Sequence, residues 1–367
     1  MVNVSRNSLL VLAAAPVPAK AAAQSAPAKP DPKAVQAGKI ALAVTDRFVI
    51  PTYRALVQAS AAQEAAWVAF AAKREAGDFT SLRAAYNADA DAWAKAQLIK
   101  TGPITLFLRY DRFAYWPEAR NATQRALDQL LMSKDPKDLT ADSLAHDSVA
   151  GQGLTALERL LYDDDAAKLL KAPGKDGVWR TQVGVAIAQN LSAIAREVLA
   201  DWTAPDGVRA AIAANKGWKN LFADAPEAAR LLLTDLVAAF KLMHDVKLLP
   251  VLGANAAAAK PKSAEAWRSG RTQRDLALNL AAAQEWETAF AATAPAAHRA
   301  KLGSLFAAAV KAVDAMPADA GAAAADPKRR ARVDAGRAAI KSVQTEIAKT
   351  LPGDVGVTLG FNSLDGD

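Results

Sequence analysis

Glu158 is the carboxylate whose sequence surroundings point most strongly to chemistry. It lies in a segment where Leu154, Leu157 and Leu161 recur at the spacing of one helix face. Glu158 follows Leu154 by four positions, so a helix would place its carboxylate among the leucines. A carboxylate that faces a core must be paired, bound to a metal or protonated, because an unpaired buried charge is costly. Glu158 is therefore a functional group, half of a structural salt bridge, or a group at the rim of a rotated helix.

Arginine side chains near tryptophan are natural partners for such a carboxylate. In the segment 266–274, helical spacing places Trp267, Arg271 and Arg274 on one face, and Arg268 directly follows the tryptophan. Guanidinium groups bind carboxylates through paired hydrogen bonds, whether the carboxylate belongs to the protein or to a ligand. The alternative is that these arginines lie over an apolar face with their charged ends in water.

A third segment, 109–117, also combines arginine with aromatic residues. Its Arg109, Arg112 and Trp116 could line a ligand cleft. Asp111 and the two arginines could equally tie a loop to the rest of the fold, so both interpretations stay open.

Metal-binding and nucleophile patterns are scarce. His146, His244 and His298 are far apart, and Asp142, one helical turn before His146, more simply forms a surface pair with it. The H-E-x-x-H, G-x-S-x-G and G-x-x-x-x-G-K patterns are absent. The sequence has no cysteine, which excludes disulfides, thiol catalysis, cysteine metal sites and a lipid-anchoring cysteine.

The elements that position these residues are predicted to be helices. The composition is 52% hydrophobic and rich in alanine, the strongest helix former, whereas runs of β-branched residues are rare. Helical periodicity includes 34–73, with a kink or break at Pro51, and 263–293. Pro173, Gly174 and Gly177 mark the clearest interruption.

This pattern predicts an all-α fold with two antiparallel helical bundles. The N-terminal bundle is expected at 34–172 and the C-terminal bundle at 178–352. Alanine disappears after residue 352. We therefore expect residues 353–367 to form a docked, extended tail that carries Asn362 and Asp365.

The N-terminus resembles a secretory signal. Arg6 precedes a short apolar run from Ser8 to Ala15, and small residues at Ala19 and Ala21 suit a cleavage site. We expect a signal peptide at 1–23, a linker at 24–33 and a periplasmic mature protein without a lipid anchor. No stretch approaches the ~20 apolar residues of a transmembrane helix, so no membrane span is expected. The net charge is +7 but acidic and basic residues alternate, so nucleic acid is not an expected partner.

Three separated segments, 148–161, 266–271 and 359–367, resemble imelysin-like proteins. The first reads Ser-Val-Ala-Gly-Gln-Gly-Leu-Thr-Ala-Leu-Glu-Arg-Leu-Leu. The resemblance implies an exported bacterial protein of two helical bundles, often associated with iron acquisition, and metallopeptidase activity for some members. It also implies iron or another divalent metal as the cofactor and other iron-uptake proteins as partners.

The family motif is G-x-H-x-x-E, to which a metal or ligand site at the domain interface is attributed. Gly153 and Glu158 match it, but Thr155 stands at the position of the histidine. Because a neutral hydroxyl is a poor zinc ligand, Glu158 is left as the one candidate metal ligand at this motif. The resemblance therefore supports the fold and export more than it supports peptide hydrolysis.

These observations predict a non-catalytic binding protein that takes a small anionic ligand or a metal chelate in the cleft between the bundles. The alternatives are an imelysin-type metal-dependent peptidase and a structural cluster that binds nothing. We expect Glu158 to be buried and within salt-bridge reach of an arginine at position 109, 112, 271 or 274. No catalytic residue is assigned, and the predicted ligand-binding residues are Glu158, Thr155, Gly153, Arg109, Arg112, Trp116, Trp267, Arg268, Arg271, Arg274, Asn362 and Asp365.

Overall fold

The computed structural model describes residues 31–360, apart from the side chain of Thr293. In this range the chain forms helices and connecting segments, with no strand and one isolated bridge between Trp218 and Phe222. The predicted all-α class is confirmed. The predicted signal peptide, the linker up to residue 30, and the site candidates Asn362 and Asp365 lie outside the described residues.

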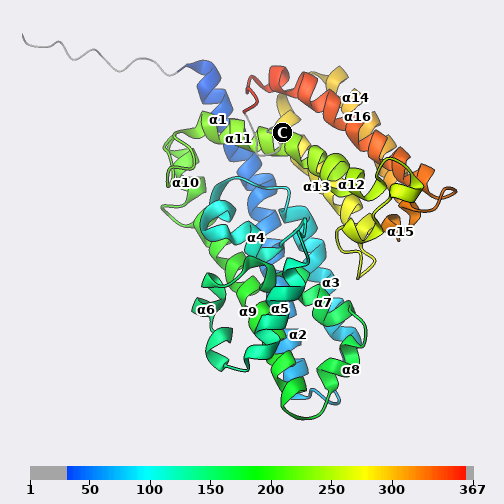
Figure 1. Cartoon of the computed structure of the whole chain (residues 1–367). Coiled ribbons are helices and arrows are strands. Elements are labelled where there is room, and N and C mark those ends of the chain that lie inside the picture. The colour runs from blue at the N-terminus through cyan, green and yellow to red at the C-terminus, as the bar shows by residue number, and fades with distance from the viewer. Residues whose placement is uncertain (1–30, 361–367) are drawn as a thin grey trace, which may run out of the picture. The chain divides into compact units, whose positions relative to one another are not determined.

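Sixteen α-helices are labelled in chain order, and most of the longer ones are visible in Figure 1. Within residues 31–360 they are α1 (Pro32–Val44), α2 (Ile50–Ala72), α3 (Phe79–Ala96), α4 (Arg109–Phe113), α5 (Ala122–Ser133), α6 (Ala141–His146), α7 (Leu154–Tyr162), α8 (Ala166–Lys171), α9 (Gly174–Thr203), α10 (Val208–Ala213), α11 (Ala225–Lys241), α12 (Leu249–Leu252), α13 (Thr272–Phe290), α14 (Ala296–Asp314), α15 (Ala320–Ala324) and α16 (Arg330–Val355).

The first two helices form one continuous run. A π-helical turn, Thr45–Val49, joins α1 to α2, so of the kink or break predicted at Pro51 the break does not occur. Pro51 stands in the first turn of α2, where a missing backbone N–H does little harm, and the π-turn before it absorbs the irregularity. Figure 1 shows this run in blue, descending past the helices of the second half.

Two groups of helices pack along this run. Its lower part, α2, packs against α3 and α9, while α1 packs against α11 and α13. Helices α14 and α16 pack together and complete the second group through contacts with α13 and α11. Helix α9 begins at Gly174, inside the predicted boundary segment. The division into two bundles at 172–178 remains a prediction.

Helix α9 is also apolar enough to be mistaken for a membrane span. Among the described residues, the segment Gly174–Ala213 has the length and composition to cross a bilayer, and the mean hydropathy of its most apolar 18-residue window is 1.2. Its most apolar window is 61% buried inside the protein. The central core position against α2 accounts for this composition.

The C-terminal helix is longer than expected. Helix α16 contains Pro352 and continues to Val355, where Gly356 ends it at a φ of 67°. Residues 353–355 are therefore helical and not part of an extended tail. Beyond them, the Gly360 N–H donates to Thr234 Oγ1 at 2.8 Å, which fixes the last described residue to α11.

Candidate functional site

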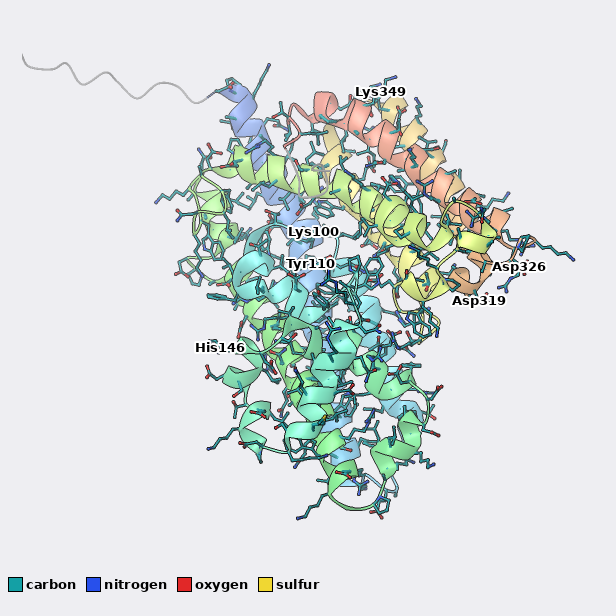
Figure 2. All side chains as sticks on the ribbon, in the orientation of Figure 1. Lys100, Tyr110, His146, Asp319, Asp326 and Lys349 are labelled. Atoms are coloured by element: carbon teal, nitrogen blue, oxygen red, sulfur yellow. The ribbon has the colours of Figure 1, made fainter. Side chains whose placement is uncertain are left out.

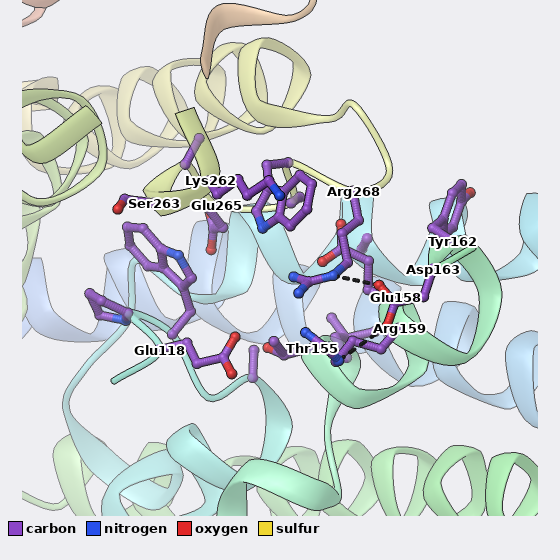
Figure 3. Close-up of a pocket in the computed structure, with 18 of the residues that line it drawn as sticks. Glu118, Thr155, Glu158, Arg159, Tyr162, Asp163, Lys262, Ser263, Glu265 and Arg268 are labelled. Carbon is purple, nitrogen blue, oxygen red and sulfur yellow. Dashed lines mark hydrogen bonds and ion pairs between the residues drawn. The ribbon is translucent and has the colours of Figure 1, made fainter. Parts of the chain in front are cut away.

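A cleft of about 1230 Å³ opens between α7, α3 and two irregular segments, 114–121 and 261–271. Figure 3 shows the labelled side chains that enter it from opposite walls. Its lining combines tryptophan and tyrosine rings with many ionisable groups. The charged residues that line it are Glu118, Arg120, Glu158, Arg159, Asp163, Asp164, Arg180, Lys262, Glu265, Arg268 and Asp275.

Gly153 sets the position of α7 against α4. It is the N-cap of α7, and a Cβ at this position would lie 2.5 Å from the Phe113 carbonyl oxygen and 2.8 Å from that of Arg112. Only glycine allows this backbone approach, so Gly153 shapes the site without lining the cleft. The leucines of α7 are buried as the stripe predicted, which directs Glu158 toward the 261–271 segment.

Glu158 is buried, with 4% of its surface exposed, which confirms the expected burial. Its Oε1 accepts hydrogen bonds from the Ser269 backbone N–H at 2.9 Å and from Ser269 Oγ at 2.7 Å. Burial raises the pKa of Glu158, although the Ser269 hydrogen bonds and the charge of Arg268 act in the opposite direction. The predicted salt bridge to an arginine is wrong, because within residues 31–360 Glu158 has no cationic partner within salt-bridge distance.

The 261–271 segment differs from the helix predicted at 263–293, since α13 begins only at Thr272. Ala266 and Gly270 have φ values of 51° and 69°, and the Arg271 N–H closes the turn on the Ala266 carbonyl at 3.1 Å. The expected helix face with Trp267, Arg271 and Arg274 is therefore wrong. Trp267 lines the cleft instead, whereas Arg271 turns toward α3.

Asp163 joins two arginines at one end of the cleft. Arg159 Nε lies 3.2 Å from Asp163 Oδ2, and Arg268 Nε donates to Asp163 Oδ1 at 2.7 Å. The Arg268 guanidinium also stacks on the Trp267 ring, 4.3 Å from its centroid. Burial and the charge of Arg268 lower the pKa of Arg159, while Asp163 raises it. Figure 3 shows Arg159 and Arg268 extending into the same space from opposite walls.

Both arginines use Nε for Asp163 and leave their outer nitrogens free. In the part of the chain that the structure describes, no protein acceptor is bound to the Nη atoms of Arg159 or Arg268. The ends of two guanidinium groups thus face the cleft at a place where each repels the other. A pair held in this way presents several N–H donors to an anion.

Arg180, on α9, also lines the cleft. Its Nε is inaccessible to solvent and has no hydrogen-bond partner, and burial lowers its pKa while Asp163 and Asp128 raise it. Sequence reasoning missed Arg159, Asp163 and Arg180. The i, i+4 spacing of Arg159 and Asp163 was a readable signal, whereas Arg180 lies in a distant helix with no such cue.

The structure places five of the predicted residues in the cleft: Trp116, Thr155, Glu158, Trp267 and Arg268. Thr155 stands on the cleft wall where its Oγ1 donates to the Tyr115 carbonyl at 3.3 Å.

The other four predicted arginines are engaged elsewhere, in ion pairs and hydrogen bonds that hold helices together. Arg109 pairs with Glu197 at 3.0 Å and Asp201 at 2.7 Å, and Arg112 donates to Gln152 at 2.9 Å and to Asn190 at 2.8 Å. Arg271 pairs with Asp275 at 2.8 Å and with Asp91, and Arg274 Nε donates to Asp91 at 2.8 Å.

The described residues do not fit a metal held by the protein alone. No group of three or more His, Asp or Glu side chains in residues 31–360 is placed to hold an ion. His146 is exposed (Figure 2), and His244 binds Gln344 on α16 at 2.6 Å. Of the acids in the cleft wall, Glu265 pairs with Lys247 and Asp275 with Arg271.

Comparisons with known proteins agree with this architecture. A family model described as Imelysin (Peptidase_M75) matches residues 49–347. An imelysin-like protein from Psychrobacter arcticum has a TM-score of 0.72 at 20% identity, over 90% of this chain and 99% of the other. A Parabacteroides distasonis protein, described as an iron-regulated protein A precursor, has a TM-score of 0.70 at 14% identity, over 90% and 96% of the two chains. No curated protein matches the chain. Because the family model spans most of the sequence, this chain belongs to the imelysin family.

Proposed function

We propose that this protein is an exported, non-catalytic binding protein of the periplasm. Its ligand is a small organic anion, or a metal carried by an anionic chelator, and it binds in the cleft between α7 and the 261–271 segment. Such a protein would serve metal acquisition, with iron as the first candidate. This use draws support from the family and from the iron-regulated name of one structural relative.

The observation that carries the proposal is the arrangement of Arg159 and Arg268 on Asp163. Their free Nη atoms face a space large enough for an organic ligand, and two guanidinium groups at close range attract an anion. Fixed positive charge repels a bare cation. A metal would therefore enter this end of the cleft as part of an anionic complex.

The two alternatives draw less support from the site. A metallopeptidase needs protein ligands that leave one metal position open and a general base. Thr155 occupies the motif position of the histidine, and the nearby carboxylates Glu265 and Asp275 are paired with cations. A purely structural cluster does not account for a cleft of about 1230 Å³ with unpaired guanidinium nitrogens.

Native mass spectrometry of protein purified from the periplasm tests the proposal. We expect the mature chain, without its first ~20 residues, to carry an additional mass that denaturation releases. An Arg159→Gln/Arg268→Gln double variant should lose that mass. Arg274→Gln is the matched control, because Arg274 is an exposed arginine outside the cleft.

Ferric citrate provides a defined probe for the same variants. The wild type and Arg274→Gln should bind it in isothermal titration calorimetry, and the double variant should bind at least about tenfold more weakly. Recovery of only the bare chain from cells, together with no difference between the double variant and Arg274→Gln in calorimetry, would refute the proposal.

A further inference from the structure

Arg180 is a cation without a counter-ion. It lies on α9, and within the described residues its side chain forms no ion pair and no hydrogen bond. Its Nε is shielded from solvent by the protein. The residue as a whole is half-buried and lines the cleft, so its guanidinium group can meet a ligand that enters there.

Arg180 belongs to a cluster of arginines from three different elements. Arg159 comes from α7, Arg180 from α9 and Arg268 from the 261–271 segment, and all three line the cleft. Asp163 is the only described carboxylate that forms ion pairs with any of them in this cluster. Burial lowers the pKa of Arg180, whereas the charge of Asp163 raises it.

Within the described residues, the cluster has more guanidinium groups than ion pairs. Asp163 pairs with Arg159 and with Arg268, whereas Arg180 forms no ion pair. Glu118 is half-buried in the cleft wall and acts on Arg159 without pairing with it. The charge of Arg268 also acts on Glu158, but burial raises the pKa of that carboxyl group and so favours its neutral form. The outer guanidinium nitrogens therefore remain for a ligand, and they attract a group with two negative charges more strongly than a group with one.

We propose that this cluster of arginines is a subsite for an oxyanion group that carries more than one negative charge. A phosphate group and the adjacent carboxylates of a polycarboxylate share this chemistry. Guanidinium groups suit it because their planar N–H pairs match the oxygen spacing of both groups. The inference rests on the proposed function, to which it adds the charge of the ligand and the role of Arg180.

Two aromatic sulfonates can be used as probes to measure the effect of ligand charge on affinity with the aromatic ring kept the same. Benzenesulfonate and benzene-1,3-disulfonate share one ring and stay fully ionised, so they differ in charge by one unit at any ordinary pH. Calorimetry at low salt should show the disulfonate binding at least about tenfold more tightly to the wild type. Arg180→Gln should weaken the disulfonate about tenfold and change the monosulfonate by less than about twofold.

Arg196→Gln is the matched control, since Arg196 is an exposed arginine on the same helix and does not line the cleft. It should bind both probes as the wild type does. Arg180→Lys keeps the charge and should retain most of the preference for the disulfonate. Circular dichroism verifies that each variant is folded.

Titration with inorganic phosphate and with citrate then shows whether the subsite prefers a phosphate group or adjacent carboxylates. Binding of either one more tightly than benzenesulfonate supports the subsite. Equal affinity for the two sulfonates, or an Arg180→Gln variant that keeps the preference, would overturn the inference and leave the proposed function standing. Failure of the wild type to bind any of these anions would contradict the proposed function itself.

Discussion

The buried carboxylate of Glu158 is hydrogen-bonded to Ser269, an uncharged partner, and the stability of the protein therefore depends on pH through this group. Because burial raises its pKa, the folded protein holds the Glu158 proton more tightly than the unfolded chain does. Its contribution to stability is therefore complete below the ordinary glutamate pKa and is lost as the pH rises through the raised value.

Glu158→Gln removes this titration while keeping an oxygen that can accept from Ser269. We expect the variant to gain stability relative to the wild type between about pH 4.5 and about pH 8. Urea unfolding of both proteins at the two pH values measures the difference. If the difference in the free energy of unfolding between the variant and the wild type is the same at both pH values, the pKa of Glu158 is not raised in the folded protein.

Arg180 allows a test of the opposite kind, in which loss of function accompanies a gain in stability. Arg180→Met removes a charge that has no protein partner and keeps most of the side-chain volume. We expect the free energy of unfolding to rise by about 1 kcal/mol, a modest gain because part of the side chain reaches the cleft. Denaturant titration measures it, and a destabilised variant would imply a protein partner for this guanidinium group.

At the level of helices, the sequence predicted which face of α7 is buried better than it predicted what that face contacts. The leucine spacing alone indicated that Glu158 faces the core, and the structure agrees. The partner could not be predicted, because Trp267 and Arg271 also fit a helical spacing. That local preference is overridden by the left-handed backbone at Ala266 and by the hydrogen bonds from Ser269 to α7.

The same limit applies to the arginines. Spacing showed that Arg109, Arg112, Arg271 and Arg274 were concentrated near aromatic residues. Three of them, Arg109, Arg271 and Arg274, each pair with a carboxylate between about 90 and 180 positions away. Pattern analysis of one sequence cannot distinguish an arginine that meets such a distant carboxylate from one that waits for a ligand.

The N-cap glycine of α7 and a glycine inside α14 offer a test of how α7 is positioned. Gly153→Ala would bring a Cβ within 2.5 Å of the Phe113 carbonyl oxygen, so we expect a loss of about 2–3 kcal/mol in the free energy of unfolding. Gly303→Ala in α14 meets no atom within 4 Å and should stabilise the protein by about 0.5–1 kcal/mol. Urea denaturation compares them, and equal effects would contradict the proposed role of Gly153.

For the whole molecule, the family name raises the question of peptide hydrolysis. We expect purified protein to show no hydrolysis of unfolded peptides with added zinc or iron, because the described carboxylates of the cleft wall other than Glu158 are mostly paired and Thr155 replaces the motif histidine. A fluorogenic peptide assay measures this. Turnover that a chelator and Glu158→Ala both abolish would establish the peptidase instead.

The continuous run from Pro32 to Ala72 bears on how a ligand could enter. Helix α1 packs against α11 and α13, while α2 packs against α3 and α9. The continuous helical run is therefore held by one helix group at each end. Rotating one helix group away from the other, so that the cleft walls move apart, would bend this helical run. The run is easiest to bend at the π-turn Thr45–Val49, where the regular α-helical hydrogen bonds are already interrupted. Any such movement of the cleft walls would therefore have to distort this turn first.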